Sequence, residues 1–197
     1  MLIKSFHGLF QQPVRVICGL WLGMIVAGHV EADSLHDVMQ SLSEIKQAEV
    51  DYQEEKHLNM LDVPLLQTGH LSYLAPDSFT RTLDAPVTGR FAIQGDKVTL
   101  EQRGESKQQN LQNLPLVKAF VASFGATLAG DLPRLQQYYE LTFSGDTASW
   151  ALVLIPKDKQ LAEYVDEIRL WGREGKIDRM EIEESNGDWS RMILLHE

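Results

Sequence analysis

The sequence contains little that could carry covalent or metal chemistry. Its 197 residues include one cysteine, Cys18, which excludes an internal disulfide and a thiolate metal cluster. A Gly-x-Ser-x-Gly elbow and a glycine-rich phosphate loop are both missing. Four Gly-Asp pairs lie between expected elements and are typical of turns and caps. We therefore expect no catalytic residue, no metal and no cofactor.

Basic residues are in the minority. The chain has 18 lysines and arginines against 28 aspartates and glutamates, which gives a formal net charge of -10. An acidic surface of this kind repels phosphate backbones and anionic lipid headgroups. This charge argues against a nucleic-acid partner and against electrostatic attachment to a membrane, but it is compatible with a basic partner protein.

Long hydrophobic runs are absent except near the N-terminus. Residues 16–28 form an uncharged run that follows a basic segment and precedes small residues. This layout is typical of a secretory signal, and the run is shorter than the roughly 20 residues of a membrane-spanning helix. We predict a signal peptide over residues 1–32, cleaved after Ala32, in preference to a permanent anchor. Residues 33–197 then form one domain without cysteine.

Hydrophobic spacing predicts three helices. Apolar residues recur at helical intervals over residues 35–48, directly after an N-cap-like Ser34. A second helix begins near Leu116, with large apolar residues every fourth position, and Gly130 ends it. A short third helix follows over residues 134–138.

The remaining chain alternates between apolar and polar residues. Turn signals occur at regular spacing, among them Ala75-Pro76-Asp77-Ser78, Gln94–Lys97 and Asn186-Gly187. This pattern predicts an α+β fold, in which a curved antiparallel sheet of about ten strands follows an N-terminal helix and accommodates two middle helices. The polar residues 101–113 are expected to form an exposed connection.

Large apolar side chains are the most informative feature. A helix that covers a curved sheet tends to leave space, and an apolar space suits an acyl chain, since each buried methylene contributes about 0.8 kcal/mol. Taken singly, each such residue is more often ordinary core. We expect the cargo-binding cavity to be lined by Leu71, Tyr73, Phe79, Leu116, Phe120, Phe124, Trp150, Leu152 and Trp171.

Two polar sets have simpler explanations than catalysis. The acids of residues 178–188 alternate along a strand, so they divide between its faces and indicate a solvated outer surface. His57 and His70 could become neighbours across strands, but they lack metal-ligand spacing. A lipid hydrolase would need a serine close to one of these histidines.

Several short motifs occur in a distinctive order, each of them weak alone. They are Tyr52-Gln53-Glu54-Glu55-Lys56, Gly69-x-Leu71-x-Tyr73, Pro76-Asp77-Ser78-Phe79, Gly95-Asp96, Val153–Lys157 and Asn186-Gly187-Asp188-Trp189-Ser190-x-x-Ile193. In this order the chain resembles the LolA-type outer-membrane lipoprotein carriers over nearly all of residues 33–197.

The resemblance implies a fold and a role. Carriers of this type have an incomplete, strongly curved antiparallel barrel, and their helices form a lid over an apolar cavity. They accept acylated lipoproteins from an ATP-driven inner-membrane transporter and pass them to an outer-membrane acceptor. The resemblance therefore implies a periplasmic, monomeric carrier in a Gram-negative bacterium, without stable membrane insertion. An alternative on the same fold is a periplasmic domain that senses lipids or lipoproteins.

The chain departs from the carriers at the opening hairpin. Carriers typically have Arg-Pro-x-x-Phe there, and the arginine forms hydrogen bonds with the lid; here Ala75 stands at the arginine position and Phe79 matches. Arg81 lies where carriers often have an aromatic residue, and residues 98–100 lack the usual tryptophan. These departures are closer to divergent LolA-like proteins that accompany the biosynthesis of lipid-tailed molecules. The cargo is therefore left open between a lipoprotein and another lipid-like molecule.

Overall fold

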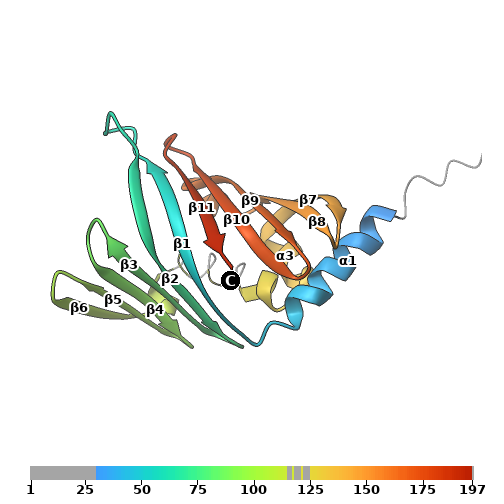
Figure 1. The fold of residues 1–197 in the computed structure, drawn as a ribbon, viewed down its shortest axis with the longest axis horizontal. Helices are drawn as coiled ribbons and strands as arrows, with labels where there is room; N and C mark the ends of the chain where they lie inside the picture. Colours follow the sequence, from blue (N-terminus) through green and yellow to red (C-terminus); the bar gives the residue numbers. More distant parts are fainter. Residues whose placement is uncertain (1–29, 115–116, 118–120, 122–124, 197) are drawn as a thin grey trace, which may run out of the picture.

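One large antiparallel sheet dominates the computed structural model, which describes residues 30–114, 117, 121 and 125–196 (Figure 1). Eleven strands follow the order β6-β5-β4-β3-β2-β1-β11-β10-β9-β8-β7. Since β6 and β7 are the two ends of this order, the sheet is not closed. The predicted antiparallel meander is confirmed, with eleven strands in place of about ten.

The strands are joined mostly by tight turns. The strands are β1 (Gln47–His57), β2 (Leu65–Leu74), β3 (Ser78–Ala85), β4 (Gly89–Gln94), β5 (Lys97–Gln102), β6 (Glu105–Asn110), β7 (Tyr139–Asp146), β8 (Ser149–Pro156), β9 (Val165–Arg173), β10 (Lys176–Glu184) and β11 (Trp189–Leu195). The described helices are α1 (Val30–Ser43), the 3-10 turn η1 (Leu111–Asn113), α3 (Leu132–Tyr138) and α4 (Lys159–Ala162). Residues 117, 121 and 125–128 also have helical backbone.

The last strand divides the sheet into two wings. Strand β11 returns beside β1, so β1 and β11 form the centre of the sheet. On one side lie β2–β6, called the open wing below. On the other side lie β7–β10 together with α1 and α3, called the packed wing (Figure 1).

The packed wing contains the main core. Helix α1 contributes Val38, Met39 and Leu42, whose spacing places them on one face of the helix. They pack against side chains of β7–β9, including Trp150 and Leu152, all of them almost completely buried. Burial on this scale, roughly 1.5–3 kcal/mol for each large apolar side chain, anchors α1 on the sheet.

The first helix lies earlier in the chain than the hydrophobic pattern predicts. It begins at Val30, before Ser34, and ends at Ser43, whereas the expected range was 35–48. Strand β1 begins at Gln47, and its first residues pair with the end of β2. The sheet therefore takes up backbone that the pattern assigned to the helix.

The expected exposed connection is in part a strand. Within residues 101–113, Glu105–Asn110 form β6, which pairs with β5 along its whole length. All six residues are exposed, so no apolar alternation marks the strand in the sequence. A short polar strand is a common way to terminate a sheet, because it gives little support to edge-to-edge association.

Two smaller features complete the fold. Helix α4 is a single turn that the sequence pattern did not predict; the Asp158 carboxylate caps it by accepting hydrogen bonds from the Gln160 and Leu161 N–H groups. Within the described residues, none of the helices combines the length and the apolar character that crossing a membrane requires.

Candidate functional site

One face of the sheet carries a continuous set of apolar side chains. Strand pairing places Leu71 and Tyr73 of β2 opposite Arg81 and Phe79 of β3, all on one face. Residues opposite each other in a sheet share a face. We call this the inner face; Met192 also lies on it.

Two pockets lie along the inner face. The first has a volume of about 1150 Å³ and extends from the end of α1 and the start of β1 to the β9–β10 turn. The second has a volume of about 500 Å³ and lies over β3–β5 and the start of β9. Four side chains line both pockets and form what we call the shared floor: Leu71, Phe79, Met180 and Met192.

The shared floor joins the two wings. Leu71 and Phe79 come from the open wing, while Met180 and Met192 come from β10 and β11. Met180 pairs with Leu170 on one side and with Met192 on the other. The two pockets therefore meet over this floor and form one groove, which is apolar at the shared floor and also has polar lining in the first pocket, including Lys46 and Lys176.

Three of the expected lining residues lie in this groove. Leu71, Tyr73 and Phe79 line the first pocket, and two of them belong to the shared floor. Trp150 and Leu152 also face inward, but they are buried at 2% and 1% exposure in the core beneath α1 and line neither pocket. In the packed wing, helix α1 fills the space that a ligand would need.

Trp171 faces the other way, so its expected place was wrong. It pairs with Ala151 and Arg179, one residue out of phase with the inward-facing Leu170. The Arg179 guanidinium lies over its ring, 4.7 Å from the ring centroid. On the outer face this contact is worth about 0.5–1 kcal/mol.

The other expected lining residues, Leu116, Phe120 and Phe124, lie outside the described residues. Their described neighbours Val117 and Val121 pack against a cluster of β4 and β5 side chains that includes Ile93 and Val98. Val117 also lines the second pocket. Val117 and Val121 therefore contact the inner face of the open wing.

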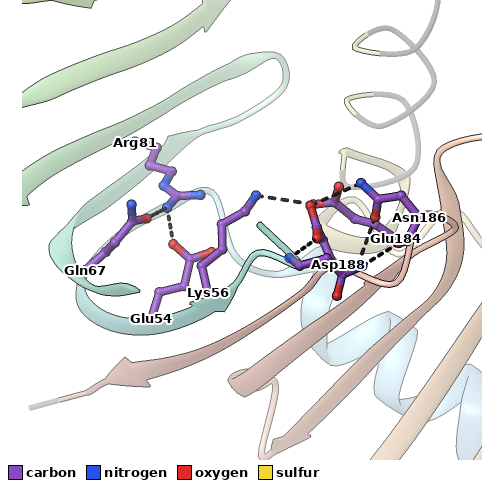
Figure 2. Close-up of polar contacts among 8 residues, drawn as sticks. Glu54, Lys56, Gln67, Arg81, Glu184, Asn186 and Asp188 are labelled. Atoms are coloured by element: carbon purple, nitrogen blue, oxygen red, sulfur yellow. Dashed lines mark hydrogen bonds and ion pairs between the residues drawn. The ribbon is translucent and has the colours of Figure 1, made fainter. Parts of the chain in front are cut away.

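A set of polar side chains borders the shared floor, since Arg81 lies opposite Leu71 and Glu54 lies opposite Met192. Figure 2 shows the Arg81 guanidinium between Glu54 and Gln67, with Lys56 extending toward Glu184. Arg81 Nη2 donates to the Glu54 carboxylate, and Lys56 Nζ lies 3.2 Å from Glu184 Oε1. We call these five residues the polar strip. The sequence signal was the parity of Arg81, which matches that of Phe79.

The arginine of this strip is tightly held. Its Nε donates to the Tyr52 hydroxyl at 3.0 Å, and Nη2 also reaches Gln67 Oε1 at 3.4 Å. The Tyr52 hydroxyl in turn donates to the Thr82 carbonyl at 2.9 Å. Gly69 leaves room for this arrangement, because a Cβ there would lie 2.0 Å from the Thr82 oxygen.

Burial and charge shift two titrations in this region. Burial raises the pKa of Tyr52 above 10.0, although the hydrogen bond and the positive charge of Arg81 act in the opposite direction. Burial lowers the pKa of Arg81, but the charge of Glu54, the charge of Tyr52 and the hydrogen bonds with both residues together outweigh that cost, and the pKa lies above its usual value. Arg81 therefore remains a cation paired with a buried carboxylate.

The described histidines and the acids of β10 form no ligand cluster. His70 Nδ1 lies 2.9 Å from Asp51 Oδ1, whereas His57 stacks on Trp189 at 5.4 Å between centroids. Among the described residues, no group of three histidines, cysteines or acids is arranged to hold a metal. The structure corrects one expectation: Glu181, on the outer face, is only 7% exposed, because arginines including Arg179 and Arg191 surround it.

An unclosed antiparallel sheet of eleven strands with a few helices is consistent with the LolA-like fold. The family model described as "Outer membrane lipoprotein carrier protein LolA-like" matches residues 27–196. This chain therefore belongs to the LolA-like family, as its motifs predicted. No curated protein matches it significantly.

Several solved structures are similar to this chain. A LolA superfamily protein from Nitrosomonas europaea is 10% identical, with a TM-score of 0.45 over 83% of this chain and 92% of that one. Lipoprotein LppX of Mycobacterium tuberculosis is 10% identical, with a TM-score of 0.44 over 83% and 94%. A Pseudomonas aeruginosa MucA/MucB complex is 11% identical, with a TM-score of 0.46 over 81% and 55%. The family assignment itself rests on the family model.

Proposed function

We propose that this protein is a periplasmic carrier that binds the acyl chains of a lipoprotein or lipid-like molecule and shuttles it from the inner to the outer membrane. The observation that carries the proposal is the shared floor. Four apolar side chains from both wings join two pockets of about 1150 and 500 Å³ into one groove. Pockets that hold small ligands usually measure about 300–1,000 Å³, so the groove has room for acyl chains.

The energetics of binding need no catalytic residue. Each acyl methylene removed from water contributes about 0.8 kcal/mol, so an apolar surface can supply the affinity. The groove offers such a surface in Leu71, Phe79 and the two methionines, whose flexible side chains adapt to irregular ligands. We therefore propose a binding cycle without chemistry.

Loading and release would depend on other proteins. The sequence has no phosphate loop, so the energy for loading would come from an inner-membrane transporter, and an outer-membrane acceptor would receive the cargo. Membership of the LolA-like family supports both partners.

The middle segment is proposed as the lid over the groove. The contacts of Val117 and Val121 with the open wing support this role. Ala75 cannot provide the side-chain hydrogen bonds of an arginine; its N–H donates to the Lys46 carbonyl at 2.9 Å, and its side chain packs against the main core. The lid must therefore be held by other contacts.

A lipid-binding measurement tests the proposal. The exported protein would be purified under mild conditions, its bound lipids identified by mass spectrometry, and its uptake of an uncharged fluorescent acyl ester measured. We expect bound lipid or saturable uptake. A protein that carries no lipid and takes up no probe would refute the carrier.

Two variants locate the binding surface. Phe79→Ala removes a shared-floor ring and should weaken probe binding about tenfold, since the lost apolar contact is worth roughly 1–3 kcal/mol. Ile193→Ala is the matched control, because Ile193 is 52% exposed and lies one residue away from Met192, on the opposite face. Equal binding by both variants would place the ligand elsewhere.

A further inference from the structure

We infer that the groove prefers acyl chains joined through a neutral ester or amide to free fatty acids, and that Arg81 with Glu54 makes this distinction. The inference rests on the proposed lipid-binding function. It specifies the chemical class of cargo, which the apolar floor alone does not decide.

Arg81 and Glu54 both lie next to residues of the shared floor. Arg81 lies opposite Leu71 in the β2–β3 pairing, and Glu54 lies opposite Met192 in the β1–β11 pairing. Both floor residues thus have a member of the polar strip as their direct neighbour on the inner face. An acyl chain that lies over the floor with its linkage toward the second pocket has its polar end at this strip.

The Arg81 guanidinium has one nitrogen, Nη1, that its described neighbours do not use. Nε and Nη2 already donate to Tyr52, Glu54 and Gln67. Among the residues that the structure describes, none accepts a hydrogen bond from Nη1. The Arg81 side chain is 31% exposed and lines the second pocket, so the side chain is reached from the groove.

The fixed geometry makes Arg81 a prepared donor. Three neighbours hold the guanidinium, and it also lies over the Tyr52 ring, 5.0 Å from the centroid. A donor that is already immobilised loses little conformational entropy when a ligand accepts from it. Nη1 can therefore bind a carbonyl oxygen at small cost.

The charges decide which carbonyl. Glu54, whose side chain is 4% exposed, balances the charge of Arg81. Lys56, the other cation of the strip, is paired with Glu184, and the nearby Arg90 lies 3.7 Å from Glu101. A free carboxylate would enter this partly buried region beside Glu54 without an unpaired cation, so both desolvation and repulsion oppose it.

A neutral carbonyl avoids both penalties. An ester or amide oxygen accepts from Nη1 without bringing a charge into the groove. The linkage would lie at the polar strip, with the chains extending over the shared floor. This orientation fits glycerol esters and N-acylated chains, and it disfavours a fatty acid.

Competition between matched ligands tests the inference. An uncharged fluorescent acyl ester would be displaced from the protein by monopalmitoylglycerol or by palmitate, both below their micelle concentrations at neutral pH. We expect the ester to compete at least about tenfold better, because a like charge beside Glu54 is costly. Equal or better competition by palmitate would overturn the inference and leave the carrier standing. Failure of the probe itself to bind would instead refute the carrier.

Variants of the pair assign the preference to its residues. Glu54→Gln leaves the Arg81 charge without its carboxylate, so palmitate should gain at least about tenfold relative to the ester. The ratio compared is the affinity for the ester divided by the affinity for palmitate. The double variant Glu54→Gln, Arg81→Met removes both charges, so this ratio should be higher than in Glu54→Gln. An unchanged ratio in Glu54→Gln would overturn the role of the pair.

A control on the same strand separates this effect from general charge. Glu55→Gln changes the neighbouring acid, which pairs with Arg191 on the outer face. Its ratio should equal that of the unaltered protein. Binding of the uncharged probe by every variant shows that the groove is intact, so a change in ratio reports selectivity and not unfolding.

Discussion

The packed wing and the open wing use the same antiparallel hairpins but treat their inner faces differently. In the packed wing, α1 covers the sheet, and Trp150, Leu152 and Leu154 are almost fully buried. In the open wing, Phe79, Leu83 and Phe91 are only half-buried, and Leu100 is 49% exposed. The inner face of the packed wing is therefore core beneath α1, whereas the open wing keeps large apolar side chains that are partly exposed.

The boundary between the wings carries the site. One row of inward-facing residues crosses β9, β10, β11 and β1, from Leu170 through Met180 and Met192 to Glu54. Along this row the environment changes from core to apolar floor and then to the polar strip. The boundary between the wings is therefore where the apolar floor ends and charged side chains begin.

The strongest test of the comparison exchanges leucine for alanine in each wing. Leu42→Ala in the packed wing should lower the free energy of unfolding by about 2–5 kcal/mol, because Leu42 is fully buried and leaves a cavity. Leu83→Ala in the open wing should cost only about 1 kcal/mol but should weaken probe binding, since Leu83 lines the second pocket. Urea unfolding and fluorescent-ester titration measure the two effects.

A surface leucine serves as the reference for both variants. Leu74 is 54% exposed, so Leu74→Ala should stay within about 0.5 kcal/mol of the unaltered protein and bind the probe normally. If Leu42→Ala and Leu83→Ala lost equal stability, the two wings would be packed alike and the comparison would fail.

A glycine exchange probes the packed wing by overfilling it. In Gly172→Ala the new Cβ would lie 2.1 Å from the Lys176 carbonyl oxygen and 2.3 Å from the Trp150 ring. Neither neighbour can yield easily, so we expect a loss of about 1–3 kcal/mol in urea unfolding. Gly125→Ala is the control, because no described atom lies within 4 Å of its Cβ position. Comparable losses in both variants would show that Trp150 is loosely packed.

The smallest expected effect lies at the boundary. Tyr52→Phe removes the hydroxyl that accepts from Arg81 and donates to Thr82, at a cost of about 1–2 kcal/mol. Burial raises the pKa of Tyr52, so in alkaline solution the unfolded chain loses a proton that the folded chain retains. The stabilising contribution of Tyr52 is therefore complete below its unfolded pKa and is lost as the pH rises through the folded pKa.

Unfolding measured at several alkaline pH values tests this linkage. The stability difference between the unaltered protein and Tyr52→Phe should shrink as the pH rises from about 9 to about 11, the range around the usual tyrosine pKa. Tyr164→Phe, a change at a 54% exposed position, is the matched control. A constant difference over this range for Tyr52→Phe would contradict the predicted linkage.

The sequence predicted local features well where alternation and turn chemistry agree. The β2–β3 hairpin, with Leu71, Tyr73 and Phe79 on one face, was predicted from the residues on both sides of Pro76. The β10–β11 turn at Asn186-Gly187 was equally clear. These elements are determined by neighbours within a few residues, so their signals survive in a single sequence.

Other features depend on distant pairing and could not be predicted in the same way. Strand β6 has no apolar pattern and is a strand because β5 offers it hydrogen bonds. Trp171 was assigned to the wrong face because the phase of β9 depends on its pairing with β8 and β10. Glu54 and Arg81 are 27 residues apart, and only the β1–β2–β3 register brings them together.

By itself, the sequence determined the antiparallel class, the acidic surface, the scarcity of reactive groups and the family, because composition, alternation and turn residues act locally or sum over the chain. Only the tertiary structure decided which apolar residues became core and which became groove. That choice depends on where α1 lies on the sheet and on the register between β1 and its neighbours. The same register placed one balanced ion pair beside an apolar floor, since burial of a charge requires a partner that the fold must supply.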